Sequence, residues 1–229
     1  MAAHPLKGQG IYIGMLGIPY HTDPGPARLS VSRIGDDGEH SQTIAFTVTA
    51  GNYRSEILQV DPSRVTPSTE NRERAQRERL EIKKIYAGAI PTRLWRQAFR
   101  FPLESIVTSV YGTRRTFNNQ LQSYHIGTDF RAPIGTPLHA ANTGVVKLTK
   151  NLFYAGNTII IDHGMNIFSI YAHLSKTEVS TGQHVDIGQR LGLTGVTGRV
   201  NGPHLHWGIK VDSVNVDPLQ FVELISSIF

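Results

Sequence analysis

The chain of 229 residues contains no cysteine. This absence excludes disulfide bonds, a thiolate nucleophile, cysteine-ligated zinc fingers and iron–sulfur clusters. Long apolar runs are also missing, since none approaches the roughly 18 residues that a membrane-spanning helix needs. The first residues, Met-Ala-Ala-His-Pro-Leu-Lys-Gly, hold no apolar signal core. If this is the natural start of the protein, the missing signal indicates a cytosolic protein. If an export signal has been removed, the first residues say nothing about the compartment.

Charged residues make up only 18% of the chain, and hydrophobic residues make up 39%. That balance supplies enough apolar side chains for a packed core and excludes a disordered or collagen-like protein. Lysine and arginine exceed aspartate and glutamate, giving a formal net charge of +5. A positive surplus favours anionic partners, which include cell-wall polymers, nucleic acids and acidic lipids, without choosing among them.

Residues 1–65 carry turn-forming residues at short intervals, for example Asp23-Pro24-Gly25-Pro26 and Gly35-Asp36-Asp37-Gly38. Short runs of alternating or β-branched character lie between these turns. This pattern predicts a small antiparallel β module of the sandwich type. No acid–base pair and no cluster of metal-ligating residues is recognisable in it.

Residues 66–97 predict a charged linker helix. Ten of the fifteen residues from Glu70 to Lys84 are charged, Ser68 can act as the N-cap, and Gly88 and Pro91 stop the helix. A solvated connecting helix is the preferred interpretation. The alternative, an arginine-rich arm that binds nucleic acid, is disfavoured because glutamates cancel much of the positive charge.

From residue 98 to residue 229, glycine, asparagine and proline recur between short strand-like runs. Helical periodicity is nearly absent until residues 218–229, which predict one short helix. The expected fold class is therefore mostly β, with the N-terminal module and the linker helix preceding a C-terminal antiparallel β-sheet domain.

Ten histidines in a chain without cysteine direct attention to metal binding. In a strand, His204 and His206 would project from the same face, while Leu205 and Trp207 would fill the opposite, buried face. An isolated H-x-H pair is a weak signal. A further histidine and carboxylate stand in His125-Ile-Gly-Thr-Asp129, and two imidazoles with one carboxylate suit Zn²⁺ with a fourth position left for water. Spacing alone does not show that residues about 80 positions apart meet.

Several fragments of the C-terminal part occur in the order found in the lysostaphin/LytM-type zinc metallopeptidases, which residues 98–220 resemble. The fragments are His125-Ile-Gly-Thr-Asp129-Phe, Tyr171-Ala-His173-Leu-Ser, Gly188-Gln-Arg-Leu-Gly192, Thr194-Gly-Val-Thr-Gly198 and Gly202-Pro-His204-Leu-His206-Trp. Enzymes of this family cut the cross-bridges or stem peptides of bacterial peptidoglycan. The N-terminal module followed by a charged helix is similar to exported Gram-negative members, which implies a periplasmic or secreted protein.

The resemblance implies one zinc ion per chain, held by His125, Asp129 and His206. It also implies that His173 and His204 handle the zinc-bound water and the transition state. All five positions carry the expected residue type. Zinc lowers the pKa of a bound water to about 7. The chain has no H-E-x-x-H motif, so no glutamate stands beside the ligands as a base, and a histidine that titrates near neutrality is suited to the task. We assign this role to His173 or His204, and the sequence leaves open which of the two it is.

The function expected from this resemblance is a zinc-dependent endopeptidase that hydrolyses peptide cross-links of peptidoglycan, and the stem-peptide cross-link is the favoured bond. The alternative is a catalytically silent wall-binding or hydrolase-activating protein of the same fold. Nucleic acid is not an expected partner, because the basic residues are scattered and no aromatic stacking signature accompanies them. The sequence identifies no regulatory protein partner.

Overall fold

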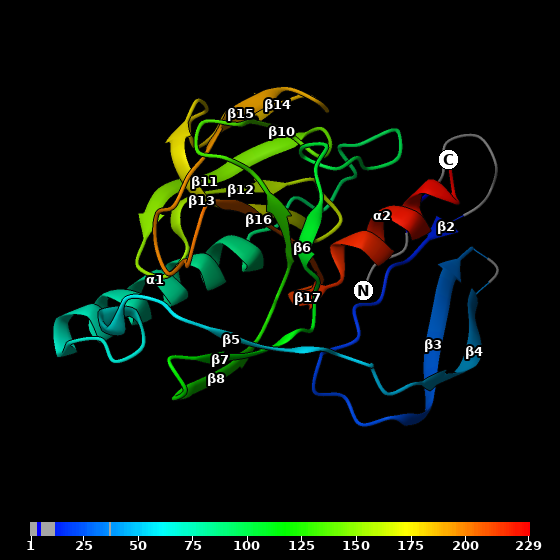
Figure 1. The fold of residues 1–229 in the computed structure, drawn as a ribbon. Helices are drawn as coiled ribbons and strands as arrows, with labels where there is room; N and C mark the ends of the chain where they lie inside the picture. Colours follow the sequence, from blue (N-terminus) through cyan, green and yellow to red (C-terminus); the bar gives the residue numbers. More distant parts are fainter. Residues whose placement is uncertain (1–3, 6–11, 37) are drawn as a thin grey trace.

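The computed structural model describes residues 4–5, 12–36 and 38–229. A ten-stranded antiparallel sheet forms the body of the C-terminal part (Figure 1). Seven of its strands follow the order β14-β11-β12-β13-β16-β9-β6, while β10 and β15 pair with each other, β15 also pairs with β13, and β17 pairs with β16. The strands are β6 (Val107–Ser109), β9 (Thr128–Arg131), β10 (Pro137–His139), β11 (Gly144–Leu152), β12 (Gly156–Asp162), β13 (Ile167–Thr177), β14 (His184–Val185), β15 (Arg190–Thr194), β16 (His204–Val211) and β17 (Val214–Val216).

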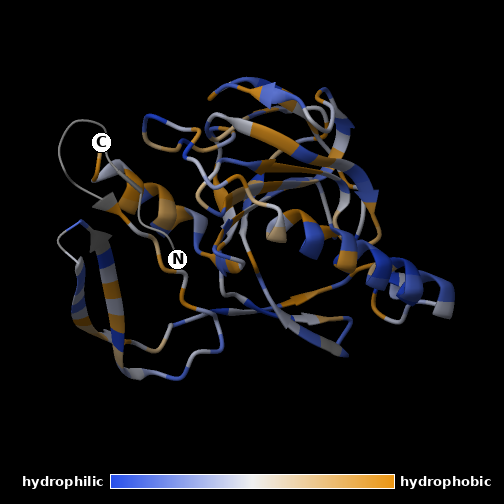
Figure 2. Ribbon diagram, turned by 180° about the vertical axis from the view of Figure 1, so that it is seen from behind, coloured by the Kyte–Doolittle hydropathy of each residue, from blue (hydrophilic) through white to orange (hydrophobic). Residues whose placement is uncertain are grey.

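Both faces of this sheet are covered, as the alternation along β12 shows. Ile159 and Ile161 are buried in the larger core, which also contains Phe221 of the C-terminal helix α2 (Pro218–Ser226). Ile160 between them belongs to a second apolar cluster on the opposite face, with Phe168 of β13. Figure 2 shows apolar colour along the central strands and along α2. The expected mostly β fold with an antiparallel sheet and a short C-terminal helix is confirmed.

Helix α1 (Thr69–Ala87) begins at the predicted N-cap, Ser68, whose hydroxyl accepts a hydrogen bond from the Asn71 amide at 3.3 Å. Most of α1 is exposed, as expected of a charged linker helix, but the helix also docks on the sheet. Tyr86 packs edge-on against Phe168 with ring centroids 4.9 Å apart, and the buried Glu78 carboxylate accepts a hydrogen bond from the Phe153 amide. The few apolar side chains near the end of α1 are enough to dock it on the sheet. Within the described part of the chain, no helix is long and apolar enough to cross a membrane.

The N-terminal part differs from the expected sandwich. Strands β3 (Gly25–Gly35) and β4 (Gly38–Val48) form a separate two-stranded hairpin, and β1 (His4–Pro5) pairs only with β2 (Tyr12–Ile13) among the described strands. Strand β5 (Ser55–Leu58) instead pairs in parallel with β7 (Arg114–Phe117), which continues antiparallel into β8 (Leu121–Tyr124). A single 3₁₀ turn (Pro62–Arg64) follows β5. Strand pairing therefore crosses the expected boundary at residue 65.

Candidate metal centre

The alternation of β16 places two histidines on one face of the sheet. Leu205 and Trp207 are fully buried in the larger core, so His204 and His206 project from the other face. His206 lies directly opposite Asp129 of the neighbouring strand β9. A cross-strand pair of this kind brings an imidazole and a carboxylate within reach of each other without any loop.

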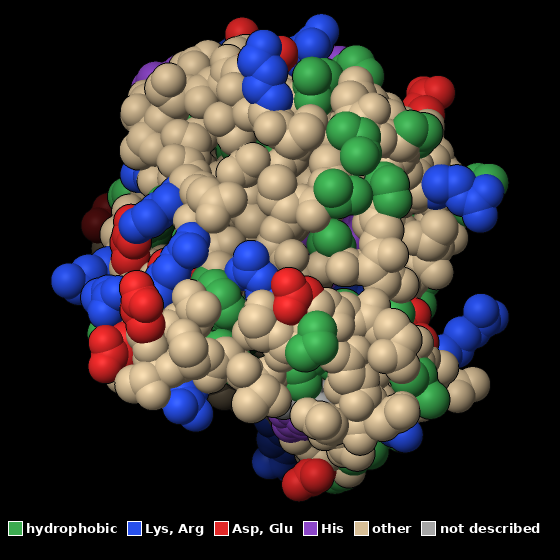
Figure 3. Space-filling view, turned by 60° about the vertical axis from the view of Figure 1, so that its left-hand side comes forward, with side chains coloured by type: hydrophobic (Ala, Val, Ile, Leu, Met, Phe, Trp, Pro, Cys, Tyr) green, Lys and Arg blue, Asp and Glu red, His purple; other side chains and the backbone are tan. Residues whose placement is uncertain are grey.

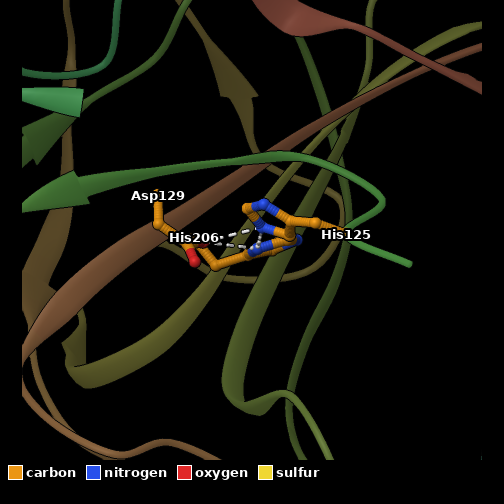
Figure 4. A group of neighbouring side chains, drawn as sticks. All are labelled: His125, Asp129 and His206. Carbon is orange, nitrogen blue, oxygen red and sulfur yellow. Dashed lines mark hydrogen bonds and ion pairs between the residues drawn. The ribbon is translucent and has the colours of Figure 1, made fainter. Parts of the chain in front are cut away.

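His125 joins this pair from the segment between β8 and β9, and three atoms converge (Figure 4). The distances between His125 Nε2, Asp129 Oδ1 and His206 Nδ1 are all 2.9 Å. His125 Nδ1 lies 3.0 Å from the Val110 carbonyl oxygen. Donation of the Nδ1 proton to that carbonyl leaves the Nε2 lone pair directed at the other two residues.

Gly127 makes this convergence possible because its missing side chain leaves room for His206. A Cβ atom at Gly127 would lie 2.4 Å from the Trp207 carbonyl oxygen and 2.8 Å from Cε1 of the His206 ring. Real Cβ atoms do not approach other atoms so closely. The glycine between the two ligand positions of the first motif is therefore required by space.

The donor set fits Zn²⁺, which prefers imidazole nitrogen and carboxylate oxygen. The protonation states also suit a cation. Burial lowers the pKa of His206 and outweighs the hydrogen bond to Asp129, so the imidazole is neutral. Burial alone would raise the pKa of Asp129, but the His125 and His206 side chains beside it hold that pKa well below its usual range. Two imidazole nitrogens and one carboxylate oxygen can hold one divalent ion.

His173 reaches the same place from a bulge in β13. The register between β12 and β13 shifts after Tyr171, and His173 has a left-handed backbone with φ of 64°. Its Nδ1 lies 2.8 Å from the Thr197 carbonyl oxygen, which makes Nδ1 the donor and leaves Nε2 as a free acceptor. Burial, assisted by His204 and His206, lowers the pKa of His173 to about 3. The ring is therefore neutral at neutral pH.

His204 stands beside His173, with ring centroids 4.9 Å apart. Its Nδ1 lies 2.9 Å from the Gly202 carbonyl oxygen, and its Nε2 lies 3.8 Å from Asp129 Oδ1. The structure thus brings together all five residues that the sequence analysis selected. Three of them converge on one point, and the other two present ring nitrogens beside it.

These side chains lie at the base of a groove with a cavity volume of about 440 Å³. One wall comes from β5, β7 and β8, and the other from the segments around Tyr154 and around residues 199–203. Figure 3 shows a small area of histidine colour between hydrophobic side chains on one face of the molecule. An extended peptide can enter such a groove and reach the histidines.

The sequence analysis missed two charged residues near Asp129: Arg115, which holds its carboxylate, and Glu56, which pairs with Arg115. Arg115 Nη2 donates to Asp129 Oδ2 at 2.6 Å, and Arg115 Nε donates to Glu56 Oε1 at 2.5 Å. Ser109 Oγ lies 3.0 Å from Arg115 Nη2 and 3.3 Å from His125 Nδ1. Glu56 comes from β5, so a residue of the N-terminal part supports the metal centre. The adjacent basic residues Arg114 and Arg115, shortly before His125, were the one sequence feature that could have indicated a charged partner for the site. Nothing in the sequence pointed to Glu56.

Replacing Arg115 by methionine is expected to weaken zinc binding about 10- to 100-fold, because the second oxygen of Asp129 then loses its charged partner. The measurement is competition for zinc against a chelating indicator. Arg114→Met is the matched control, since Arg114 is an exposed neighbour on the same strand. Equal affinity in the two variants would show that the ion pair does not support the site.

Two other polar residues, His163 and Asn118, do not reach the metal centre. His163 is completely buried, with Nδ1 2.8 Å from the Thr143 carbonyl oxygen and Nε2 2.7 Å from Ser169 Oγ. The side-chain amide of Asn118 bonds both backbone groups of Val60 at 2.9 Å. His163 is therefore structural, and Asn118 ties the chain beyond β5 to the turn between β7 and β8.

Comparison with known proteins places this geometry in context. The model of Peptidase family M23 matches residues 123–218. A peptidoglycan DD-endopeptidase, ShyA of Vibrio cholerae, is 46% identical over 115 residues, which cover 49% of this chain but only 27% of ShyA. A crystal structure assigned to peptidase M23 from Pseudomonas aeruginosa has a TM-score of 0.74 and 31% identity, covering 96% of this chain and 83% of that one. A zinc-containing peptidase from Vibrio cholerae has a TM-score of 0.50 and 36% identity, covering 53% of this chain and 39% of that one.

Proposed function

Because the chain belongs to peptidase family M23, we propose that it is a zinc-dependent endopeptidase that hydrolyses peptide cross-links of bacterial peptidoglycan. The observation that carries this proposal is the convergence of His125, Asp129 and His206 at 2.9 Å from one another. The names of the related Vibrio cholerae proteins, peptidoglycan DD-endopeptidases, support the choice of substrate. The chain spans less than a third of the length of these relatives.

In this proposal His125 Nε2, Asp129 Oδ1 and His206 Nδ1 hold the zinc ion. When bound, zinc polarises the scissile carbonyl group and makes a water molecule acidic enough to ionise near neutral pH. The buried carboxylate of Asp129 balances part of the added charge. Arg115 keeps that carboxylate in the orientation that presents Oδ1 to the ion.

His173 and His204 supply the proton transfer and the charge stabilisation. Each has its Nδ1 at a backbone carbonyl, so each presents Nε2 toward the groove. A neutral imidazole with a free Nε2 can take a proton from the attacking water. The other ring, once it carries a proton on Nε2, can donate a hydrogen bond to the carbonyl oxygen as negative charge develops there.

The proposed bond is the cross-link between stem peptides, and the proposed site of action is the periplasm or the cell exterior, where peptidoglycan lies. The formal net charge of +5 would favour contact with an anionic sacculus. The complete set of five histidine and aspartate side chains supports an enzyme over a catalytically silent, hydrolase-activating relative.

Digestion of purified sacculi with and without a zinc chelator tests the proposal, with the released fragments identified by mass spectrometry. Without chelator, we expect the cross-linked dimers to be lost while the sugars stay intact. With chelator, we expect no fragments to be released. Addition of zinc after removal of the chelator restores cleavage. A folded, zinc-loaded protein that releases nothing would contradict the enzymatic proposal and favour the activating role.

A further inference from the structure

We propose that Arg199 forms a carboxylate-binding subsite in the groove, which selects acidic stem peptides over uncharged glycine bridges. This inference rests on the proposed function, since it names the chemistry of the substrate that the same groove accepts. Arg199 lies in the segment between β15 and β16 and lines the groove together with the five site residues.

The guanidinium of Arg199 lies between two aromatic rings. Its Cζ is 4.1 Å from the centroid of the Phe117 ring and 4.7 Å from that of the Tyr154 ring. Two cation–π contacts of this kind restrain a guanidinium and leave its N–H groups available for hydrogen bonds. The side chain is therefore ordered before any ligand arrives, which lowers the entropic cost of binding.

Arg199 has no anionic partner within the described part of the chain. Its half-buried side chain makes no ion pair and no side-chain hydrogen bond there. Burial lowers the pKa of Arg199, and the positive charge of Arg115 nearby acts in the same direction. Arg115, by contrast, is neutralised by Glu56 and Asp129. A half-buried guanidinium without a carboxylate partner favours binding of an anion. Because Arg199 lines the groove, a ligand in the groove can supply that anion.

The backbone holds Arg199 in this position. The Arg199 amide donates to the Tyr154 carbonyl oxygen at 2.7 Å. Gly198 before it has φ of 83°, and a Cβ there would lie 2.4 Å from the same carbonyl oxygen. The subsite is also close to the metal centre. Arg115 and Phe117 are two residues apart on β7, so they share one face and lie about 7 Å apart along the strand.

The ligand chemistry follows from this geometry. A guanidinium binds a carboxylate through two parallel hydrogen bonds. Stem peptides carry free carboxylates close to their cross-link, whereas a bridge made of glycine carries none between its ends. An arginine that lines the same groove as the metal centre would thus bind the first kind of peptide and gain nothing from the second.

Calorimetric titration of the zinc-loaded protein with a single stem peptide tests this subsite without requiring cleavage. The probe is used with its carboxylates free and with them amidated, on the unmodified chain and on Arg199→Gln. We expect the unmodified chain to bind the free form about 10- to 100-fold more tightly than the amidated form, the range for one charge-assisted contact. Arg199→Gln is expected to bind both forms equally and weakly. Arg190→Gln is the matched control, because Arg190 is paired with Glu178 outside the groove.

Equal binding of the two probes by the unmodified chain would overturn the subsite, and this comparison needs no variant to fold. A preference that persists in Arg199→Gln with normal zinc content would overturn it as well. Hydrolysis of a cross-linked dimer is measured in parallel. If the chain binds with the expected preference but cuts nothing, the proposed function fails and the subsite stands; if it cuts but shows no preference, only the subsite fails.

Discussion

Replacing His206 by alanine is expected to remove zinc and abolish hydrolysis, whereas replacing His204 by alanine is expected to abolish most hydrolysis and leave zinc in place. The two side chains leave the same face of β16, two residues apart. His206 Nδ1 lies 2.9 Å from both partner ligand atoms, while His204 Nε2 lies 3.8 Å from Asp129. Among the described residues, His125, Asp129 and His206 form a group whose ligand atoms all lie within 4.8 Å of one another, and His204 is not part of that group.

The expected loss for His204→Ala is about 10²- to 10⁴-fold in kcat, the range that one general acid or base contributes. The measurements are zinc content of the purified variants and release of cross-linked fragments from sacculi. His184→Ala serves as the histidine control, because His184 is exposed on β14 and lies outside the groove. Equal loss of zinc in His206→Ala and His204→Ala would contradict this division of roles.

Replacing Gly127 by alanine is expected to destroy the metal centre although no ligand is changed. The added Cβ would lie 2.4 Å from the Trp207 carbonyl oxygen and 2.9 Å from Nε2 of His206. Either β16 moves away from the β8–β9 segment or the His206 ring rotates, and both movements separate the three ligand atoms. Overpacking of this kind also costs about 1–3 kcal/mol of stability. Zinc affinity and chemical denaturation are the measurements.

Gly202→Ala is the matched control for this substitution. Gly202 lies in the groove wall, and a Cβ there would meet no atom within 4 Å. We expect this variant to keep both its zinc affinity and its free energy of unfolding. If Gly127→Ala also binds zinc normally, the glycine is not required by space and the argument from the packed His206 ring is wrong.

Much of the metal centre follows from local sequence. The alternation of His204, Leu205, His206 and Trp207 predicts two histidines on a wet face over a buried one, and the structure has this arrangement. The meeting of His206 with Asp129 does not follow from spacing, because it depends on which strands become neighbours. Only the resemblance to a known family supplied that information before the structure did.

Neither the ion pairs that support Asp129 nor the pairing of the N-terminal strands could be predicted from the sequence, and the physical reasons differ. The link from Glu56 to Arg115 joins residues 59 positions apart, and a lone glutamate in a strand has no periodicity that marks its partner. Alternation along residues 25–58 identifies strands correctly, but it does not say which strand each one pairs with. The sandwich was therefore wrong, although the strands assigned to it exist.

The parallel pairing of β5 with β7 sets where this protein can be recombined with its relatives. A crossover at residue 65 would exchange Glu56 while keeping Arg115, and the inherited arginine would meet whatever side chain the donor supplied. A crossover between Val48 and Ser55 falls after the separate hairpin and before β5. Glu56, Arg115 and Asp129, which contact one another in series, then all come from the same parent protein. The charged contacts that support the metal centre therefore begin at β5, and the hairpin before it contributes none of them. Tyr20, ahead of the hairpin, still stacks on Tyr124 of the groove wall with ring centroids 3.9 Å apart.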